Sequence, residues 1–486
     1  MGQNLVRTVF QILSAVVLSR LLLPEQFGTF AVMMVLHGLV APLIGGAFSK
    51  ALIQKHDLSE EEASNFFWIA FAVAALFATA FAVAGPAIAA IFGNPIYSDL
   101  AIAFAALVWL DTVGAQYQAI VMRSMRFDVL FHIQLFTMPL ALAAGVTAAL
   151  AGLGTWALVI HMAVSSGMMR LLLMRALGWR PRRFSRVVGV RGMVNFGALM
   201  SLGSVTRLAY DRLPTLFLAK LAGPSAAGFF NRGDALFKRP LEQAIYPVAA
   251  LLLPTMAASA KDRSRLQQLV VQGIWLLTLS MGPLIAVIAV FGDWIAAVLL
   301  GVQWVEAGNV MRWMAVMALG VPSRRTLASA NAALGRPARS VGLKLVLLPP
   351  FLGLMFWAAP QGAAMAAMIM ALFYVGMLPL EIAVLVRNLP LNLRAILRGS
   401  LASLMVITLV GGMMQGLRTV LPGMVDPTVP RLSDVADLFA VFLGAYVAAF
   451  MLAALFPEPR TFFRLIIGKL ATRLPGRTRR ASQTLQ

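Results

Sequence analysis

The stretch SRLLLPEQFG at residues 19–28 closes one apolar segment of the chain and opens the next. Residues 219–228 read AKLAGPSAAG, so that a leucine, a proline and a glycine recur at an offset of 200 residues. Proline ends a helix and suits the first turn of the next one, and glycine lets two helices approach closely. The recurrence predicts that the chain contains two copies of one helical unit, each of which begins with a tight helix hairpin.

The composition of the 486 residues is that of a membrane protein. Hydrophobic residues make up 60% of the chain and charged residues 12%, whereas charged residues make up about 25% of a soluble domain. The chain has no cysteine, which excludes disulfide bonds, a thiol nucleophile and thiolate ligands for a metal. The four histidines are far apart and no phosphate-binding loop occurs, so we expect no metal site, no cofactor and no ATP-driven pump.

Apolar runs of about 20 residues predict about fourteen membrane-spanning helices in an all-α protein. The runs lie near residues 5–23, 27–48, 65–92, 98–121, 131–152, 155–177, 195–221, 226–257, 268–291, 307–333, 340–358, 362–386, 395–415 and 434–456. Of the 40 lysines and arginines, 25 fall in connections that follow even-numbered spans or in the C-terminal tail. By the positive-inside rule both termini are predicted to be cytoplasmic. The net charge of +21 therefore reflects membrane topology, and we expect no binding of nucleic acid.

The repeat extends over most of the chain. IAAIFGNPIY at residues 88–97 matches IAAVLLGVQW at residues 295–304, and the offset of 207 there is expected if the loops of the two copies differ in length. Each copy contains six spans, an even number, so the copies are predicted to be parallel, with a site near the midplane between them. The predicted parts are an N-lobe at residues 1–185, a C-lobe at 186–392, two further spans at 393–456 and a basic cytoplasmic tail at 457–486.

Arginines in the first helix of each copy are candidates for binding an anion. Arg7 and Arg207 align at the offset of 200 residues, and Arg207 lies 12 residues into its span, which corresponds to about 18 Å. A charge at that depth costs roughly 2.5 kcal/mol or more unless it faces protein or water. The two arginines could hold a diphosphate through paired hydrogen bonds. Alternatively, Asp211 neutralises Arg207 one turn away, which leaves Arg212 unpaired, and Arg7 reaches the cytoplasmic surface.

The eighth span is unusually polar for a membrane helix. Its sequence, GFFNRGDALFKRPLEQAIYP, must line water or the interior of the bundle, and it could be broken at Pro240. Arg232 can pair with the nearby Asp234, whereas Lys238 and Arg239 are expected to leave net positive charge near mid-depth. An outer loop that dips into the protein is the alternative interpretation of this segment.

Two acids within the spans are candidates for coupling transport to an ion. Asp111 in the fourth span and Asp211 in the seventh could relay a proton or bind a cation. Each could equally be a structural carboxylate held by hydrogen bonds. Glu62, in the sequence SEEEAS, is instead predicted to form a capping box with Ser59 at the start of the third span.

Four motifs resemble the polysaccharide transporter family, the flippases for lipid-linked oligosaccharides in the multidrug/oligosaccharidyl-lipid/polysaccharide exporter superfamily. They are LSRLLLPEQFGTFA, KALIQKHDLSEEEASNFFW, GFFNRGDALF with LLPTMA, and LLGVQWVEAGNVMRWMA. The resemblance covers roughly residues 1–390 and implies a V-shaped pair of six-helix lobes that works by alternating access. It implies as substrate an oligosaccharide linked to undecaprenyl diphosphate. It also places six basic residues at the diphosphate: Arg7, Arg207, Arg212, Arg232, Lys238 and Arg239.

The lead interpretation is a flippase of the bacterial inner membrane rather than an enzyme. It would move its substrate from the cytoplasmic to the periplasmic leaflet for exopolysaccharide or O-antigen synthesis, next to the polysaccharide polymerase machinery. A cation-coupled multidrug exporter of the same superfamily is the alternative, although the excess of arginine in spans seven and eight disfavours it. A membrane polymerase or glycosyltransferase would need a large extramembrane loop, and the longest outer connection is residues 417–433. The tail, with seven basic residues, is expected to bind anionic lipid.

Overall fold

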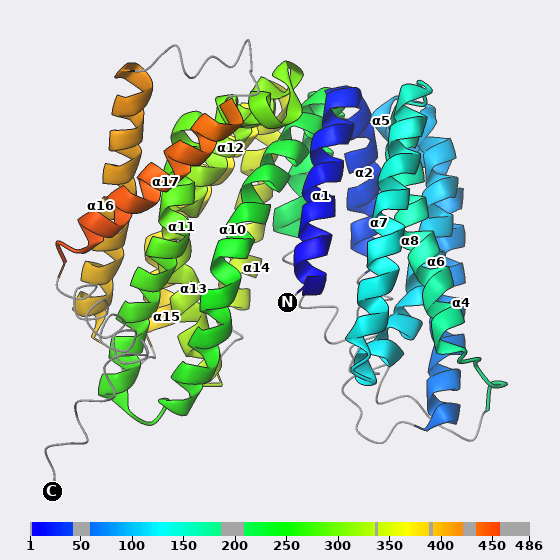
Figure 1. Cartoon of the computed structure of the whole chain (residues 1–486), viewed down its shortest axis with the longest axis horizontal. Coiled ribbons are helices and arrows are strands. Elements are labelled where there is room, and N and C mark those ends of the chain that lie inside the picture. The colour runs from blue at the N-terminus through cyan, green and yellow to red at the C-terminus, as the bar shows by residue number, and fades with distance from the viewer. Residues whose placement is uncertain are drawn as a thin grey trace, which may run out of the picture. The chain divides into compact units, whose positions relative to one another are not determined.

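The computed structural model describes residues 2–41, 59–185, 209–335, 339–387, 392–420 and 434–456. Every regular element in these ranges is a helix, which confirms the all-α prediction for this part of the chain (Figure 1). Nine of the helices in these ranges are long and apolar enough to cross a membrane.

The helices follow the order of the predicted spans. In the first copy they are α1 (Gly2–Leu21), α2 (Pro24–Ala41), α4 (Glu60–Val83), α5 (Gly85–Phe92), α6 (Ile96–Arg123), α7 (Phe127–Leu150) and α8 (Thr155–Leu177). In the second copy residues 209–221 are helical. They are followed by α10 (Pro224–Ala258), α11 (Arg263–Leu300), η2 (Val302–Trp304), α12 (Val305–Met317), η3 (Ala318–Gly320), α13 (Val321–Ala333), α14 (Arg339–Ala358), η4 (Ala359–Gln361) and α15 (Ala363–Val386). The two further spans are α16 (Leu393–Val420) and α17 (Asp434–Ala453).

The chain forms two compact units. The first consists of Met1–Arg232, Leu299–Ala307 and Lys344–Ile369, and the second of Gly233–Val298, Gly308–Leu343 and Met370–Gln486. The first unit thus contains the first copy together with parts of the second copy: the helix at 209–221, the first turns of α10, and the segments Leu299–Ala307 and Lys344–Ile369. The lobe boundaries predicted from the sequence stay a prediction.

A break near the C-terminal end of the third span recurs in both copies. The predicted third span, 65–92, is divided into α4 and α5, which meet at Ala84. The corresponding point in the second copy, 207 residues later, is Phe291, where α11 has the non-helical φ of −108° and ψ of 16°. A glycine follows each break. A Cβ on Gly85 would lie 3.1 Å from a carbonyl oxygen of the next helix, and a Cβ on Gly292 would lie 2.7 Å from one. The apolar run alone did not reveal this break, because hydropathy does not distinguish a bent helix from a straight one.

The two copies meet, within the first unit, at their Pro–Gly turns. A Cβ added to Gly28 would lie 1.6 Å from the carbonyl oxygen of Pro224, and a Cβ added to Gly228 would lie 2.0 Å from that of Pro24. The first turns of α2 and α10 are therefore in direct backbone contact. The same two positions contribute from each side, and such reciprocal contacts are what a two-fold relation between copies produces. The internal repeat predicted from these very residues is confirmed.

A second reciprocal contact lies beside the first. Arg20, the second-last residue of α1, donates from Nε to the carbonyl oxygen of Leu299 at 3.3 Å. Lys220, the second-last residue of the helix at 209–221, donates to the carbonyl oxygen of Ile91. Both acceptors lie in the last turn of a helix, where carbonyl groups lack an intrahelical donor and a cation is favoured. Each copy therefore caps a helix of the other.

The start of α4 is fixed by the predicted capping box and by a contact with the segment after α8. The Ser59 hydroxyl accepts from the Glu62 amide at 3.1 Å, and the Glu62 carboxylate accepts from the Ser59 amide at 3.1 Å, which confirms the prediction. The Asn65 side chain then hydrogen bonds with both the carbonyl and the amide of Ser185, at 2.6 and 2.7 Å. The end of the first copy is thereby held against its third span.

The two further spans belong to the second unit and are joined to its other helices by hydrogen bonds. Thr278 of α11 and Ser403 of α16 share a hydrogen bond of 2.5 Å, and the Tyr446 hydroxyl of α17 donates to the Ser280 carbonyl at 2.7 Å. Ser323 of α13 donates to Ser400 of α16 at 2.8 Å. Hydroxyl groups thus join helices whose packing in lipid gains little from the hydrophobic effect.

We predict that Gly28→Ala destabilises the protein, because its Cβ would overlap the Pro224 carbonyl and overpacking costs about 1–3 kcal/mol. Gly38→Ala on the same helix is the matched control. A Cβ at Gly38 meets no atom within 4 Å, so alanine should raise stability by about 0.5–1 kcal/mol through its helix preference. The measurement is the melting temperature in detergent. Equal melting temperatures for the two variants would contradict the close contact.

Candidate functional site

Arg232 is the candidate whose surroundings the structure defines most fully. It lies two turns into α10, and its guanidinium carbon is 4.3 Å from the centroid of the Phe27 ring. Phe27 meets the ring of Trp304 edge to face at 5.3 Å, and Phe229 meets the same indole at 6.0 Å. Arg232 is half-buried, so this cation–π contact is partly withdrawn from solvent. We call the contact of Gly28 and Gly228 with the opposite proline carbonyls the junction of the copies. Phe27 and Phe229 are the sequence neighbours of these glycines, so a cation is held among aromatic rings at the junction.

The polar stretch of α10 is one continuous helix. α10 runs from Pro224 to Ala258 through Pro240, so neither the predicted break nor the loop alternative holds. Lys238 forms an ion pair with Asp234 at 2.9 Å. The pair forms because residues four apart lie on the same face of a helix. The net positive charge expected for this stretch stays a prediction. Arg239, the next residue, is exposed.

For the remaining candidate residues within the described ranges, the structure gives the exposure of the side chain. Arg7 on α1 and Arg212 in the helix at 209–221 are exposed, and Asp211 is half-buried. Arg207 and the basic tail lie outside the described residues. A shared anion site for the six basic residues stays a prediction, as does a coupling role for Asp211.

Asp111 has partners that the sequence did not reveal. The Ser166 hydroxyl donates to its Oδ1 atom, and Arg170 Nη2 lies 3.5 Å from the same oxygen. His37 Nε2 lies 3.5 Å from the other oxygen, Oδ2. The carboxylate of α6 is thus shared with side chains of α2 and α8. No local spacing could indicate this cluster, because its members come from three spans. The available signal was the presence of a charged residue, Arg170, within an apolar segment.

Residues 17–309 match the family described as "Polysaccharide biosynthesis protein", which is more than half of the chain. The protein belongs to this family. The resemblance inferred from the four motifs is therefore confirmed.

The chain is also similar to a curated relative in sequence and to two solved structures in fold. The succinoglycan biosynthesis transport protein ExoT of Rhizobium meliloti (strain 1021) is 25% identical over 306 residues, which are 62% of this chain. The match spans 61% of the length of that relative. Lipid II flippase MurJ in an inward closed conformation superposes with a TM-score of 0.72 at 10% identity, covering 96% of this chain and 98% of that one. An inward-facing multidrug resistance MATE family transporter of the MOP superfamily gives 0.56 at 16% identity, covering 82% and 94%. The predicted fold of the superfamily is thereby confirmed.

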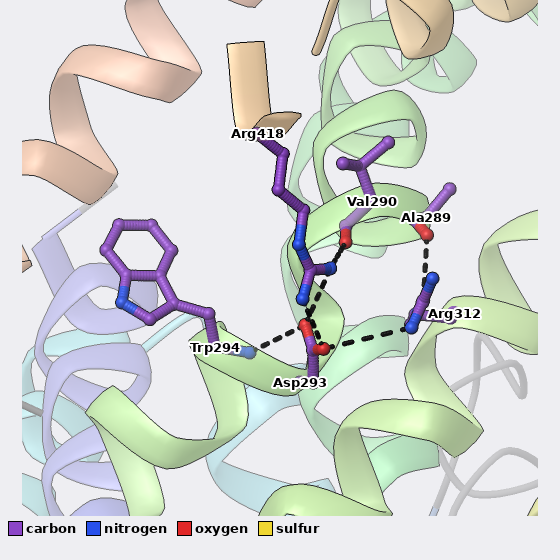
Figure 2. Close-up of polar contacts among 6 residues, drawn as sticks. All are labelled: Ala289, Val290, Asp293, Trp294, Arg312 and Arg418. Atoms are coloured by element: carbon purple, nitrogen blue, oxygen red, sulfur yellow. Dashed lines mark hydrogen bonds and ion pairs between the residues drawn. The ribbon is translucent and has the colours of Figure 1, made fainter. Parts of the chain in front are cut away.

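A second charged cluster lies at the bend of α11. Figure 2 shows Arg418 of α16 and Arg312 of α12 converging on Asp293. Arg418 binds both oxygens of that carboxylate, with Nη1 3.1 Å from Oδ1 and Nη2 2.7 Å from Oδ2. Arg418 also donates to the carbonyl of Val290, and Arg312 Nε donates to that of Ala289 at 3.2 Å. Carbonyl groups released at a helix bend need new donors, and the two arginines supply them.

An ion pair joins the fourth span to the sixth in each copy of this family member. In the second copy Arg324 Nη1 of α13 lies 3.4 Å from Glu381 Oε2 of α15, and the guanidinium carbon is 5.2 Å from the Tyr374 ring centroid. At the offset of 210 residues that relates Arg126 to Arg336, Asp111 and Arg170 correspond to positions 321 and 380. The second pair therefore lies within one helical turn of those positions, with the signs of the charges exchanged. We interpret the pair itself as a structural element of both copies.

We predict that Arg418→Ala destabilises the protein by about 3 kcal/mol or more, the usual result of removing one partner of a buried ion pair. The variant would leave Asp293 with Arg312 at 3.8 Å and would leave the Val290 carbonyl without this donor. Arg398→Ala, an exposed arginine on the same helix, is the control and should change stability by less than about 0.5 kcal/mol. Denaturation in detergent measures both. Similar effects of the two variants would show that the cluster does not anchor α16.

Proposed function

We propose that this protein is a flippase that moves an oligosaccharide linked to undecaprenyl diphosphate across the bacterial inner membrane. Transport would run from the cytoplasmic to the periplasmic leaflet, with both termini of the protein in the cytoplasm. Membership of the polysaccharide biosynthesis family, similarity to a succinoglycan biosynthesis transport protein and the fold shared with a lipid II flippase support the proposal. The product would serve exopolysaccharide or O-antigen synthesis, and a polymerase would then take it over.

The observation that carries the proposal is Arg232, a cation held in an aromatic setting where the two copies meet. It belongs to a region with excess positive charge. The described parts of spans seven and eight contain five basic and three acidic residues: Arg212, Lys220, Arg232, Lys238 and Arg239, and Asp211, Asp234 and Glu242. A cleft with walls of low dielectric constant strengthens the field of such charges, which favours an anion. The planar fork of arginine matches the oxygens of a diphosphate better than an ammonium group does.

The junction of the copies suggests how the substrate would pass. In the described state the first turns of α2 and α10 touch, and on the predicted topology this contact lies at the outer ends of the helices. Opening it would separate Arg20 and Lys220 from the carbonyls they cap and would release Arg232 from the Phe27 ring. The guanidinium could then follow the diphosphate, so that the new ion pair offsets the lost cation–π contact. The prenyl chain would remain in lipid during this exchange.

We predict that charge at position 232 decides transport. Arg232→Lys should retain part of the activity, Arg232→Gln should reduce it about 100-fold, and Arg232→Glu should reduce it further, because a charge-assisted contact contributes about 1.5–3 kcal/mol and a carboxylate repels the diphosphate. The measurement is the appearance of labelled undecaprenyl-diphosphate-linked oligosaccharide on the far leaflet of vesicles that contain the protein.

Arg265→Glu, at an exposed position in the first turn of α11, is the matched control and should transport normally. Equal activity of all three Arg232 variants would show that the position does not sense charge. A wild-type protein that extrudes cationic dyes and leaves the labelled lipid in place would instead be a cation-coupled multidrug exporter.

A further inference from the structure

A titratable site lies inside the first unit, where side chains of α2, α6 and α8 meet. Asp111 is 15 residues from the start of α6 and 12 residues from its end. At 1.5 Å per residue, it lies at least about 18 Å from both ends of that helix. The side chains of His37, Asp111 and Arg170 are exposed by only 9%, 18% and 14%. Ionisable groups at such depth in a membrane helix are rare and mark functional sites by default.

The geometry gives each oxygen of the Asp111 carboxylate a different set of partners. Oδ1 accepts from Ser166 and faces Arg170, whose Nη1 atom also donates to Gln118 Oε1 at 2.7 Å. Oδ2 faces His37 Nε2 at 3.5 Å. That nitrogen is buried and has no hydrogen-bond partner within the described residues. A proton on it would complete a charge-assisted hydrogen bond to Oδ2 after a small movement of either side chain.

The charges of this cluster depend on a single proton. With His37 neutral, Arg170 balances the charge of Asp111. With His37 protonated, the same carboxylate faces two cations.

Other titratable residues of the helices around α6 lie in terminal turns or face elsewhere. They are Glu25 of α2; Glu60, Glu61 and Glu62 of α4; Asp99 and Arg123 of α6; Asp128 and His132 of α7; Arg175 of α8; and His161 of α8, which packs on Gly145 of α7.

A glycine makes room for the cluster. A Cβ added to Gly114 would lie 2.0 Å from Cδ of Arg170. The aliphatic part of Arg170 therefore runs across the bare backbone of α6, which brings its guanidinium to Asp111 on the same helix. The site depends on this close approach of α8 to α6.

The second copy shows which part of the cluster is structural and which part is specific to the first copy. Both copies have an ion pair between the fourth and sixth spans, Asp111 with Arg170 and Arg324 with Glu381. All four histidines of the chain lie between residues 37 and 161, so the second copy contains none. His37 is therefore an addition to an otherwise repeated ion pair, and histidine is the side-chain type whose ordinary charge change lies near neutral pH.

We propose that His37 and Asp111 form a proton-binding site that couples proton uptake to the transport cycle. His37 lies on α2, the helix whose first turn carries Phe27 and Gly28 at the junction of the copies. A proton on His37 draws α2 toward α6 and thereby acts on the contact that has to open. The coupling to transport rests on the proposed flippase function, whereas proton binding itself does not.

The first experiment measures transport of the labelled lipid-linked oligosaccharide in vesicles between about pH 5.5 and 8, the range over which a histidine side chain changes charge. We expect the wild-type rate to change by about tenfold across this range and His37→Gln to abolish that change. The ring of His132 hydrogen bonds with the carbonyl of Asp128 on its own helix, so His132→Gln should behave as wild type. Glu381→Gln should lower the rate or the yield while keeping the pH dependence. A His37→Gln variant that retains the full pH dependence overturns the proposal.

The second experiment needs no substrate. In protein labelled with ¹⁵N at histidine, the ring signal that disappears in His37→Gln belongs to His37. We expect this signal to titrate with one proton and its midpoint to differ between the wild type and Asp111→Asn. A His37 signal that does not titrate, or whose midpoint is the same in Asp111→Asn, overturns the proton site. If the signal titrates as expected and the wild-type protein moves no lipid-linked oligosaccharide, the flippase proposal fails and the proton site stands.

Discussion

The backbones of α2 and α10 touch at Gly28 and Gly228, where an added methyl group would lie 1.6 or 2.0 Å from a proline carbonyl oxygen. No other residue type permits that approach, since every other side chain begins with a Cβ. The contact brings the end of one helix of each copy within reach of a basic residue from the other, Arg20 at Leu299 and Lys220 at Ile91. It also sets the aromatic rings beside Arg232. A pair of glycines thus determines where the candidate site can form.

A second constraint is the cost of charge within apolar helices. Removing an ion from water is unfavourable unless a partner of opposite charge and further hydrogen bonds compensate. Three carboxylates illustrate this, and each meets an arginine from a different helix: Asp111 with Arg170, Asp293 with Arg418, and Glu381 with Arg324. Because lipid provides little hydrophobic drive between helices, such pairs help to fix which faces of the helices meet. The same pairs would hold the spans in register while the junction of the copies opens and closes.

Local features of the structure could be predicted from the sequence, and contacts between spans could not. The sixth span was predicted at residues 155–177, and α8 has those limits because apolar length is a local property. The capping box of Ser59 and Glu62 needs only a three-residue spacing, and it was predicted for the same reason. The partners of Asp111 lie 74 residues before it and 59 residues after it, so no spacing rule could identify them. The bend at Phe291 was missed because its stabilising arginines come from two other helices.

The absence of cysteine from the chain allows a direct test of whether the junction of the copies has to open. Arg20→Cys and Leu299→Cys, combined in one chain, place a thiol on each side of the contact between α1 and α11. A short bifunctional thiosulfonate would link them through a disulfide bond to each thiol, which reduction cleaves. Transport of the lipid-linked oligosaccharide into the far leaflet would be followed before linking, after linking and after reductive cleavage. We expect linking to stop transport and cleavage to restore it. Transport at an unchanged rate in the linked protein would contradict an alternating-access route through this junction.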